Sequence, residues 1–209
     1  MLKLKKIAIT GSIGSGKSQV CRMLAENGAY IVDSDQIVHQ LLTPDTTLGR
    51  KIIELLGNEI VIDEKIDRAK VAKRVFLNPK QLHSLEELLH PSVYAEIEKS
   101  YAAICKAKNP PPFFVAEIPL LFETKAVNNF DKTILVTSNT ELRLNRFQKS
   151  TGYEREDFNN RNARFLSEEE ALSRADYVIE NNGTLEDLRL KVNQLFDTLC
   201  NNATLCDEK

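Results

Sequence analysis

A single lysine stands among glycines and serines in the stretch "GSIGSGKS", Gly11 to Ser18. The spacing fits G-x-x-x-x-G-K-[ST], the phosphate-binding P-loop pattern. Glycines let successive backbone N–H groups turn inward around an anion, and Lys17 brings a positive charge to the β- and γ-phosphates. The Ser18 hydroxyl is the usual magnesium ligand of such a loop. The alternative is an ordinary surface turn, because Gly and Ser also form loops.

The segments on either side favour the phosphate-binding interpretation. Before the glycines stands "KKIAIT", Lys5 to Thr10, which is short and β-branched enough for a buried strand. After them, Val20, Met23 and Leu24 follow at helical spacing, and Gly28 stands where a C-terminal cap is expected. The pattern therefore predicts a bound nucleoside triphosphate with Mg²⁺, without indicating where the phosphoryl group goes.

Carboxylates follow two other apolar runs. "VDSD" offers Asp33 and Asp35, and "FFVAEIP" carries Glu117 at the Walker B position, where it can hold Mg²⁺ directly or through water. Ligands of open parallel sheets bind at the carboxyl ends of strands, so these side chains are candidates for the reaction site. One aspartate can instead cap the helix that begins near Ser34. We expect Asp35 to cap this helix and Asp33 to point at the substrate.

Composition limits the class of protein. The chain has 209 residues, 42% hydrophobic and 28% charged, with a net charge of −2, which fits one sizeable core and does not suggest a broad nucleic-acid surface. The apolar run before the glycines is too short for a signal peptide, and no stretch approaches the ~20 apolar residues of a membrane span. The cysteines lack metal-site spacing and are expected to be reduced thiols of a cytoplasmic protein. They are Cys21, Cys105, Cys200 and Cys206.

Apolar runs alternate with helical patterns, which predicts an α/β fold: a three-layer α/β/α arrangement with a five-stranded parallel sheet. The expected strands are 5–10, 29–35, 112–119, 132–138 and 175–181. Between the second and third strands, Gln36 to Lys108 is expected to be wholly helical. The interval Thr140 to Arg174 carries five arginines between Glu141 and Phe165 and a break at Gly152. It is either a set of solvated helix faces or a lid that closes on phosphates, and we favour the lid.

The division of the chain follows from these intervals. We expect a nucleotide-binding core (1–35, 109–139 and 175–209), a helical substrate domain (36–108) and a lid (140–174). The GTPase elements D-x-x-G and N-K-x-D are absent from the expected places in the sequence. A compact small-molecule kinase is therefore the favoured class. The alternatives are a P-loop kinase of another nucleoside or metabolite, and a non-catalytic ATP-sensing module.

The ordered set of motifs resembles the dephospho-coenzyme A kinases over nearly the whole chain. The motifs are "GSIGSGKS", "VDSDQIVHQLL", "IDRAKVAKRVF", "LEELLHPSV", "EIPLLFE", the arginine-bearing segment and "ADYVIENNG". The resemblance implies ATP-dependent transfer of phosphate to the ribose 3′-hydroxyl of dephospho-coenzyme A, with Mg²⁺ and no obligate protein, membrane or nucleic-acid partner. It also implies a nucleotide core, a helical substrate domain and a lid.

The resemblance assigns roles by position. Asp33 matches the family's base or orienter of the 3′-hydroxyl, and Arg68 and His90 fall in the substrate domain. Arg146 matches a lid arginine that reaches the ATP phosphates, and Asn181 lies near the expected adenine pocket. The implied nucleotide-binding residues are Gly11, Ile13, Gly14, Ser15, Gly16, Lys17, Ser18, Gln19 and Asn181, with Ser18 and Glu117 as metal ligands.

The sequence departs from the family pattern at several positions. Gln19 replaces the usual Thr, Glu117 replaces Asp, and a lid glutamine is Arg143. A second lid arginine is Ser150, and a later glutamine is Phe165, for which Arg143, Arg161 or Arg164 are candidate replacements. The usual Asp-Gly turn reads Asp63-Glu64, so we expect that turn to use another geometry.

Overall fold

The structure is a computed structural model that describes residues 4–76, 78–124 and 126–204. The chain divides into two compact units. Unit 1 takes in the described residues of 4–32 and 103–204, and unit 2 takes in the described residues of 33–102. No helix in these described ranges is long and apolar enough to cross a membrane.

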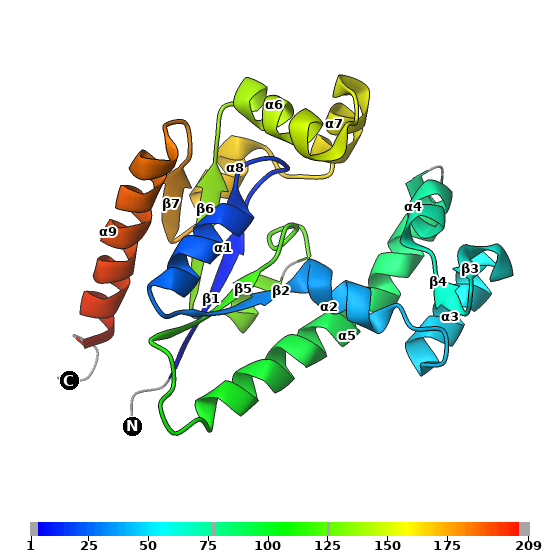
Figure 1. Ribbon diagram of the computed structural model, residues 1–209, viewed down its shortest axis with the longest axis horizontal. Coiled ribbons are helices and arrows are strands. Elements are labelled where there is room, and N and C mark those ends of the chain that lie inside the picture. Colours follow the sequence, from blue (N-terminus) through cyan, green and yellow to red (C-terminus); the bar gives the residue numbers. More distant parts are fainter. Residues whose placement is uncertain (1–3, 77, 125, 205–209) are drawn as a thin grey trace. The chain divides into compact units, whose positions relative to one another are not determined.

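Unit 1 is built on a five-stranded sheet in the order β2-β5-β1-β6-β7 (Figure 1). The strands are β1 (Lys5–Thr10), β2 (Tyr30–Asp33), β5 (Phe113–Glu117), β6 (Lys132–Thr137) and β7 (Tyr177–Glu180). β1 runs parallel to both β5 and β6, and β6 runs parallel to β7. Because Ile9 pairs with Glu117, the end of β5 lies beside the exit of β1 into the glycine-rich loop.

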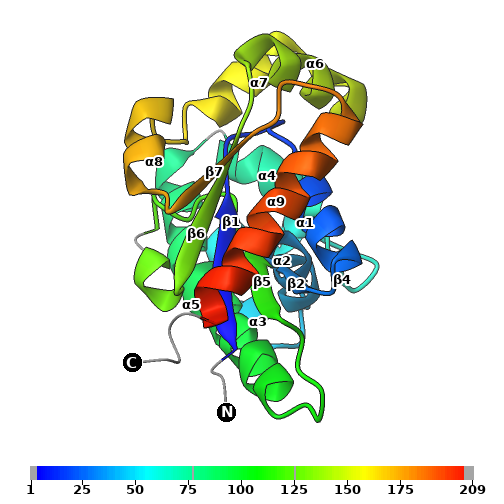
Figure 2. The same cartoon turned by 90° about the vertical axis from the view of Figure 1, so that its left-hand side faces the viewer.

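Helices cover this sheet because its strands are apolar on both faces. α1 (Lys17–Glu26) and α9 (Leu185–Thr204) pack on one face, where α9 crosses in front of the strands in Figure 2. Their apolar sides enclose the main core together with inward side chains of β1, β5, β6 and β7. The remaining helical elements of unit 1 are α6 (Thr140–Thr151), α7 (Arg155–Asn162), α8 (Glu168–Arg174) and the short η2 (Ala126–Asn129).

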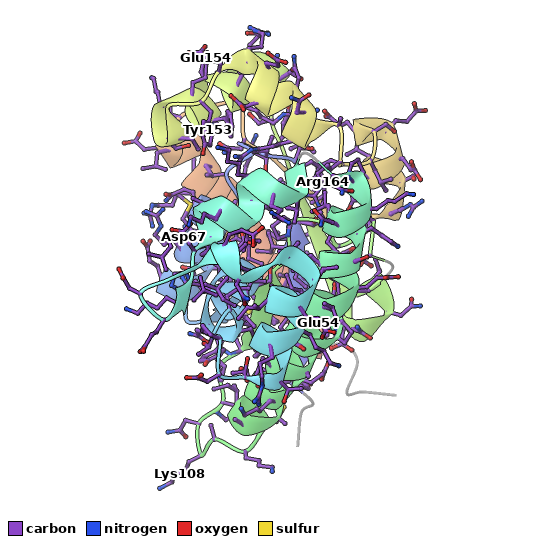
Figure 3. The ribbon with its side chains drawn as sticks, turned by 90° about the vertical axis from the view of Figure 1, so that its right-hand side faces the viewer. Glu54, Asp67, Lys108, Tyr153, Glu154 and Arg164 are labelled. Carbon is purple, nitrogen blue, oxygen red and sulfur yellow. The ribbon has the colours of Figure 1, made fainter. Side chains whose placement is uncertain are left out.

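Unit 2 is mainly helical and has its own core. Its elements are α2 (Ser34–Leu41), α3 (Thr47–Leu56), η1 (Asn58–Ile60), β3 (Val61–Ile62), β4 (Lys65–Ile66), α4 (Arg68–Phe76) and α5 (Pro79–Cys105, which continues into unit 1). The core joins α3, η1, α4 and the first half of α5 through Ile52, Leu56, Ile60, Val71, Val75 and Leu85. Asp67 caps the start of α4 by accepting a hydrogen bond from the Lys70 amide at 2.8 Å, and its label marks that place in Figure 3.

The five expected strands and the fold class are confirmed, with ends that differ by one or two residues. Gly28 and Gly152 end α1 and α6 with positive φ angles of 95° and 72°, as the helix patterns predict. Cys21 is buried at 3% exposure and packs in the main core. The structure does not describe Leu77 and Cys206, so those parts of the expectations lie outside it.

The expectation of a wholly helical interval from Gln36 to Lys108 is wrong. β3 and β4 form an antiparallel hairpin in which Val61 pairs with Ile66. Its two turn residues, Asp63 and Glu64, have φ angles of 47° and 60°. Positive φ at both positions is the type I′ geometry that Asp-Gly favours, so the expectation of a different turn geometry is also wrong. Glu64 adopts a left-handed conformation that glycine would adopt with less strain.

Candidate functional site

The loop between β1 and α1 depends on glycine at two close approaches. Gly14 and Gly16 have φ angles of 72° and 99°. A Cβ atom on Gly14 would lie 2.4 Å from the Arg143 carbonyl oxygen, and one on Gly16 would lie 2.3 Å from the Asn181 Nδ2 atom. Left-handed glycines of this kind let successive backbone N–H groups turn toward an anion, and α1 adds the positive end of its dipole at the end of the loop. The loop is therefore shaped to bind an anion.

Lys17 is folded over this loop. Its Nζ atom donates hydrogen bonds to the carbonyl oxygens of Gly11 at 2.7 Å and Ser12 at 3.3 Å. The side chain thus arches from the first turn of α1 back to the start of the loop. A charge held there lies across the space that the loop encloses, where a phosphate chain would bind.

Ser18 and Glu117 form the second polar contact of the site. The Ser18 hydroxyl donates to Glu117 Oε1 at 2.8 Å, and Glu117 is 8% exposed. Thr10 fixes the neighbouring backbone, because its hydroxyl donates to the Pro119 carbonyl at 3.0 Å. The structure therefore brings together the two residues that the sequence proposed as metal ligands.

These two oxygen-bearing side chains fit a magnesium ion. Within the described residues, no group of three or more His, Cys, Asp or Glu side chains could hold a metal ion. Mg²⁺ does not require such a cage, because it keeps several waters and binds through one or two protein oxygens and substrate phosphates. A hydroxyl and a carboxylate in contact at the edge of a phosphate loop supply that kind of ligand set.

Arg146 and Asn181 meet on the outer side of the loop. The Asn181 Nδ2 atom donates to the Ser15 carbonyl at 2.8 Å. The Arg146 guanidinium donates to the same carbonyl at 3.4 Å, to the Gly14 carbonyl at 3.5 Å and to the Asn181 carbonyl at 3.0 Å. The contacts of Arg146 with phosphate and of Asn181 with adenine stay predictions, since the contacts described here are with protein.

Helices α6 and α7 pack on the same loop through a small apolar cluster. Leu144, Phe147 and Phe158 are buried together, and Ile13 of the loop packs against them. Tyr153 and Glu154 lie in the connection from α6 to α7 (Figure 3). The Ile13 side chain therefore joins the loop to α6 and α7. Gln19 lies in the first turn of α1, where its amide donates to the Gly16 carbonyl at 3.0 Å.

Arg143 is a buried residue that connects α6 to α7. Its guanidinium donates to the Ser138 carbonyl at 3.0 Å, to Asn162 at 2.7 Å and to Thr140 at 3.2 Å, and it lies over the Phe158 ring. Burial lowers the pKa of this guanidinium, and the Glu168 carboxylate partly offsets that effect. The described contacts of Arg143 are those of a residue that joins α6 to α7.

In unit 2, Asp33 ends β2 and caps α2. Its Oδ1 atom accepts hydrogen bonds from the amides of Asp35 at 2.8 Å and Gln36 at 3.3 Å. The expectation that Asp35 is the cap is therefore wrong. The reason is that the first helical residue is Ser34, which places the amides of the next two residues within reach of the Asp33 carboxylate.

The other two proposed substrate residues also lie in unit 2. Arg68 is the first residue of α4, and its Nη1 atom lies 2.8 Å from Nδ1 of His39 on α2. His90 is half-buried in the middle of α5, immediately before Pro91. The structure thus links Arg68 to the helix that Asp33 caps.

Sequence reasoning missed two residues that contact the proposed site residues. Ser138 follows β6, and its hydroxyl donates to the Asn181 carbonyl at 2.8 Å and lies 3.1 Å from Arg146 Nη1. His39 accepts from Arg68. Ser138 could have been found as a polar residue directly after a strand of a parallel sheet. His39 carried no comparable signal, since its partner is 29 residues away in the chain.

The architecture and the loop together define the class of protein. A parallel sheet flanked by helices, with a G-x-x-x-x-G-K-S loop between β1 and α1 and a Glu at the end of a neighbouring strand, is the core of a P-loop kinase. A family model described as dephospho-CoA kinase matches residues 5–187. The chain belongs to the dephospho-CoA kinase family.

Individual relatives agree with this assignment. A protein of Protochlamydia amoebophila (strain UWE25) named dephospho-CoA kinase is 46% identical over 199 residues, which cover 95% of this chain and 98% of the relative. The structure called TT1252 from Thermus thermophilus is similar with a TM-score of 0.78 and 32% identity, over 94% of this chain and 98% of that one. Dephospho-CoA kinase from Campylobacter jejuni has a TM-score of 0.70 and 27% identity over the same shares.

Proposed function

We propose that the chain transfers the γ-phosphoryl group of ATP to the ribose 3′-hydroxyl of dephospho-coenzyme A, giving coenzyme A and ADP. The observation that carries the proposal is the match to the dephospho-CoA kinase family over residues 5–187. The contact between Ser18 and Glu117 supports it, because it places a hydroxyl and a carboxylate where a P-loop kinase needs them.

The phosphate side of the reaction belongs to unit 1. Loop amides from Gly14 to Ser18 bind the phosphate chain, and Lys17 turns from the Gly11 carbonyl to the β- and γ-phosphates. Ser18 holds Mg²⁺, with Glu117 as a direct ligand or one that acts through water. When bound, the metal neutralises charge on the β- and γ-oxygens.

The acceptor side belongs to unit 2. Within the described residues, both capping hydrogen bonds go to Oδ1 of Asp33, and we assign Oδ2 to the acceptor hydroxyl. The hydroxyl oxygen forms the new bond to the γ-phosphorus while the bond to the β-phosphate oxygen breaks, and Asp33 takes the hydroxyl proton. Arg68 and His90 bind the acceptor, for which the guanidinium of Arg68 suits an anionic group such as its diphosphate.

Two proposed site residues remain, Arg146 and Asn181. We propose that Arg146, on α6, and Asn181, at the end of β7, act on the nucleotide side of the reaction. The use of ATP fits a cytoplasmic reaction, as do Cys21, Cys105 and Cys200, which form no disulfide within the described residues.

The test is an assay with ATP and Mg²⁺ that compares dephospho-coenzyme A with nucleosides and small hydroxylated metabolites. We expect dephospho-coenzyme A to be the preferred acceptor, with phosphorus NMR placing the new monoester on the ribose 3′-oxygen. Faster turnover of a nucleoside or small metabolite would contradict the substrate and favour another P-loop kinase. ATP binding without turnover of any acceptor would instead favour a sensing module.

A further inference from the structure

The outward carbonyl groups of the phosphate loop are bound by side chains from distant parts of the chain. A loop that points its N–H groups at a phosphate points the intervening carbonyl groups away from it. In this loop the carbonyl of Ser15 accepts from Asn181, which is 166 residues away in sequence. The same carbonyl and that of Gly14 lie 3.4 and 3.5 Å from Arg146 Nη1, so a positive charge stands beside both oxygens.

Asn181 is itself held at three points. It directly follows β7, and its backbone amide donates to the Thr137 carbonyl at 2.8 Å. Its carbonyl accepts from the Ser138 hydroxyl at 2.8 Å and from Arg146 at 3.0 Å. The residue is only 7% exposed. The ends of β6 and β7 therefore determine where its side-chain amide points.

The Ser15 carbonyl requires a hydrogen-bond donor at the end of the Asn181 side chain. Nδ2 faces a carbonyl oxygen, so a carboxylate at this position would place two oxygens against each other. Gly16 lies close to the same side chain, since a Cβ atom added there would lie 2.3 Å from Nδ2. The side chain thus bonds one loop residue and packs against the next.

We propose that Asn181 and Arg146 are positioning residues of the phosphate loop: they hold the carbonyls of Ser15 and Gly14 from outside, so that the loop amides stay directed at the phosphates. The inference rests on the proposed use of ATP and deepens it. If the inference is right, both residues affect the binding of any phosphate chain, whatever base the nucleotide carries. Because Arg146 lies on α6, it also ties the phosphate loop to the lid helix.

The first experiment compares Asn181→Asp with Asn182→Asp. Both variants gain the same charge at neighbouring positions, but the Asn182 side chain bonds Asn139 and Glu180 and not the loop. Binding of ATP and of inorganic tripolyphosphate, each with Mg²⁺, is measured by calorimetry. Because Asn181→Asp loses a buried hydrogen bond, it should lower the affinity for both ligands by the same factor, about 10- to 100-fold. Asn182→Asp should change both affinities by less than about 3-fold.

The comparison separates positioning from recognition of the base. If Asn181→Asp weakens ATP and leaves tripolyphosphate unchanged, Asn181 acts on the adenosine part and the inference is wrong. Unchanged binding of both ligands also overturns it. A wild-type protein that binds both ligands but does not phosphorylate dephospho-coenzyme A contradicts the proposed function and leaves the positioning test intact.

A second measurement needs neither ligand nor a fully stable Asn181 variant. Arg146→Ala changes a half-buried residue, and hydrogen exchange is followed in the ligand-free protein at the Ser15 amide, which donates to the Ser12 carbonyl at 3.2 Å. A positioning role predicts exchange at least about 10-fold faster at this amide, with no change in β6 or β7. Unchanged exchange in the loop would mean that Arg146 does not hold it, and would overturn the inference for that residue.

Discussion

Asp33 has two chemical tasks that a single substitution separates. Asn caps helices about as well as Asp, so Asp33→Asn should keep α2 and the thermal stability of the protein. The amide cannot take a proton from the acceptor hydroxyl, and removal of a general base typically costs about 100- to 10,000-fold in rate. We expect turnover with dephospho-coenzyme A to fall by that factor while ATP affinity, measured by calorimetry, stays unchanged. Turnover within a few-fold of the parent would leave Asp33 with its capping role alone.

Lys17 should be the most sensitive residue of the phosphate loop. In the ligand-free protein its Nζ atom bonds the Gly11 and Ser12 carbonyls, so Lys17→Ala removes a tie within the loop as well as the charge for the phosphates. Loss of one preorganised charge at a transferring phosphoryl group costs about 100- to 1,000-fold in kcat. The control is Lys99→Ala, which changes an exposed lysine on α5. Steady-state kinetics should show no such loss of kcat for this control variant. Near-normal turnover of Lys17→Ala would contradict the phosphate-binding role.

At this scale the sequence predicts residues whose contacts are local and misses those whose contacts are distant. Lys17 and Ser18 follow from the spacing of one short motif. The cap of α2 was assigned to Asp35 because two aspartates flank Ser34 and the pattern does not say which residue begins the helix. The contact of Asn181 with Ser15 could not be predicted, because it depends on how β7 ends beside a loop near the other terminus.

Among the elements, strands with strong apolar runs were predicted and a short polar hairpin was not. β1, β5 and β6 have apolar runs that are buried in the unit 1 sheet, whereas β2 and β7 each bury only one residue, Val32 and Ile179. β3 and β4 have only two residues each, and their turn lacks the glycine that usually indicates type I′ geometry. Packing of Ile60 and Ile66 in the unit 2 core stabilises this hairpin against its weak local propensity.

Asp176 ties the start of β7 to the start of β6, and this tie should depend on pH. Burial tends to raise the pKa of its carboxyl, but hydrogen bonds from Lys132 and from the Thr133 amide and hydroxyl outweigh burial and lower it. A carboxyl whose pKa is lower in the folded state stabilises the protein above its unfolded pKa of about 3.9, and this stabilisation is lost as pH falls through the folded value.

The lowered pKa of Asp176 predicts the effect of Asp176→Asn on stability. The variant should lose about 1 kcal/mol of unfolding free energy at pH 7, a value reduced for the partial exposure of the ion pair. The difference from the parent should shrink as the pH is lowered below about 4, because the parent carboxyl is then protonated as well. Urea unfolding at several pH values measures this. A difference that stays constant down to pH 2 would mean that the charge of Asp176 does not stabilise the fold.

For the whole molecule, the two units divide the proposed residues into two sets. Lys17, Ser18 and Glu117 belong to unit 1, whereas Asp33, Arg68 and His90 belong to unit 2. Sequence reasoning anticipated a helical insertion between the second and third strands, and a separate compact unit is found there. Its substrate contacts could not be derived from pattern alone, because helical periodicity identifies a buried face and not a ligand.

This division predicts that substitutions in unit 2 act on the acceptor and not on ATP. Arg68 is the clearest case, since its guanidinium bonds His39 on the helix capped by Asp33. Arg68→Gln should raise KM for dephospho-coenzyme A by about 10-fold or more, the usual effect of losing a charged hydrogen bond of about 1.5–3 kcal/mol. KM for ATP should stay within a factor of about two, because the substitution removes a binding contact to the acceptor and none to ATP.

Arg74→Gln is the matched control for that prediction. Arg74 lies on the same helix α4 and pairs with Glu59 at the surface, with 42% of its side chain exposed. Surface ion pairs contribute about 0–1 kcal/mol, so Arg74→Gln should leave both KM values unchanged. His39→Asn, which keeps an oxygen near the position of Nδ1, should retain more of the acceptor affinity than His39→Leu, which removes the partner of Arg68. If Arg68→Gln raised KM for ATP and left that for dephospho-coenzyme A unchanged, unit 2 would not be the acceptor unit.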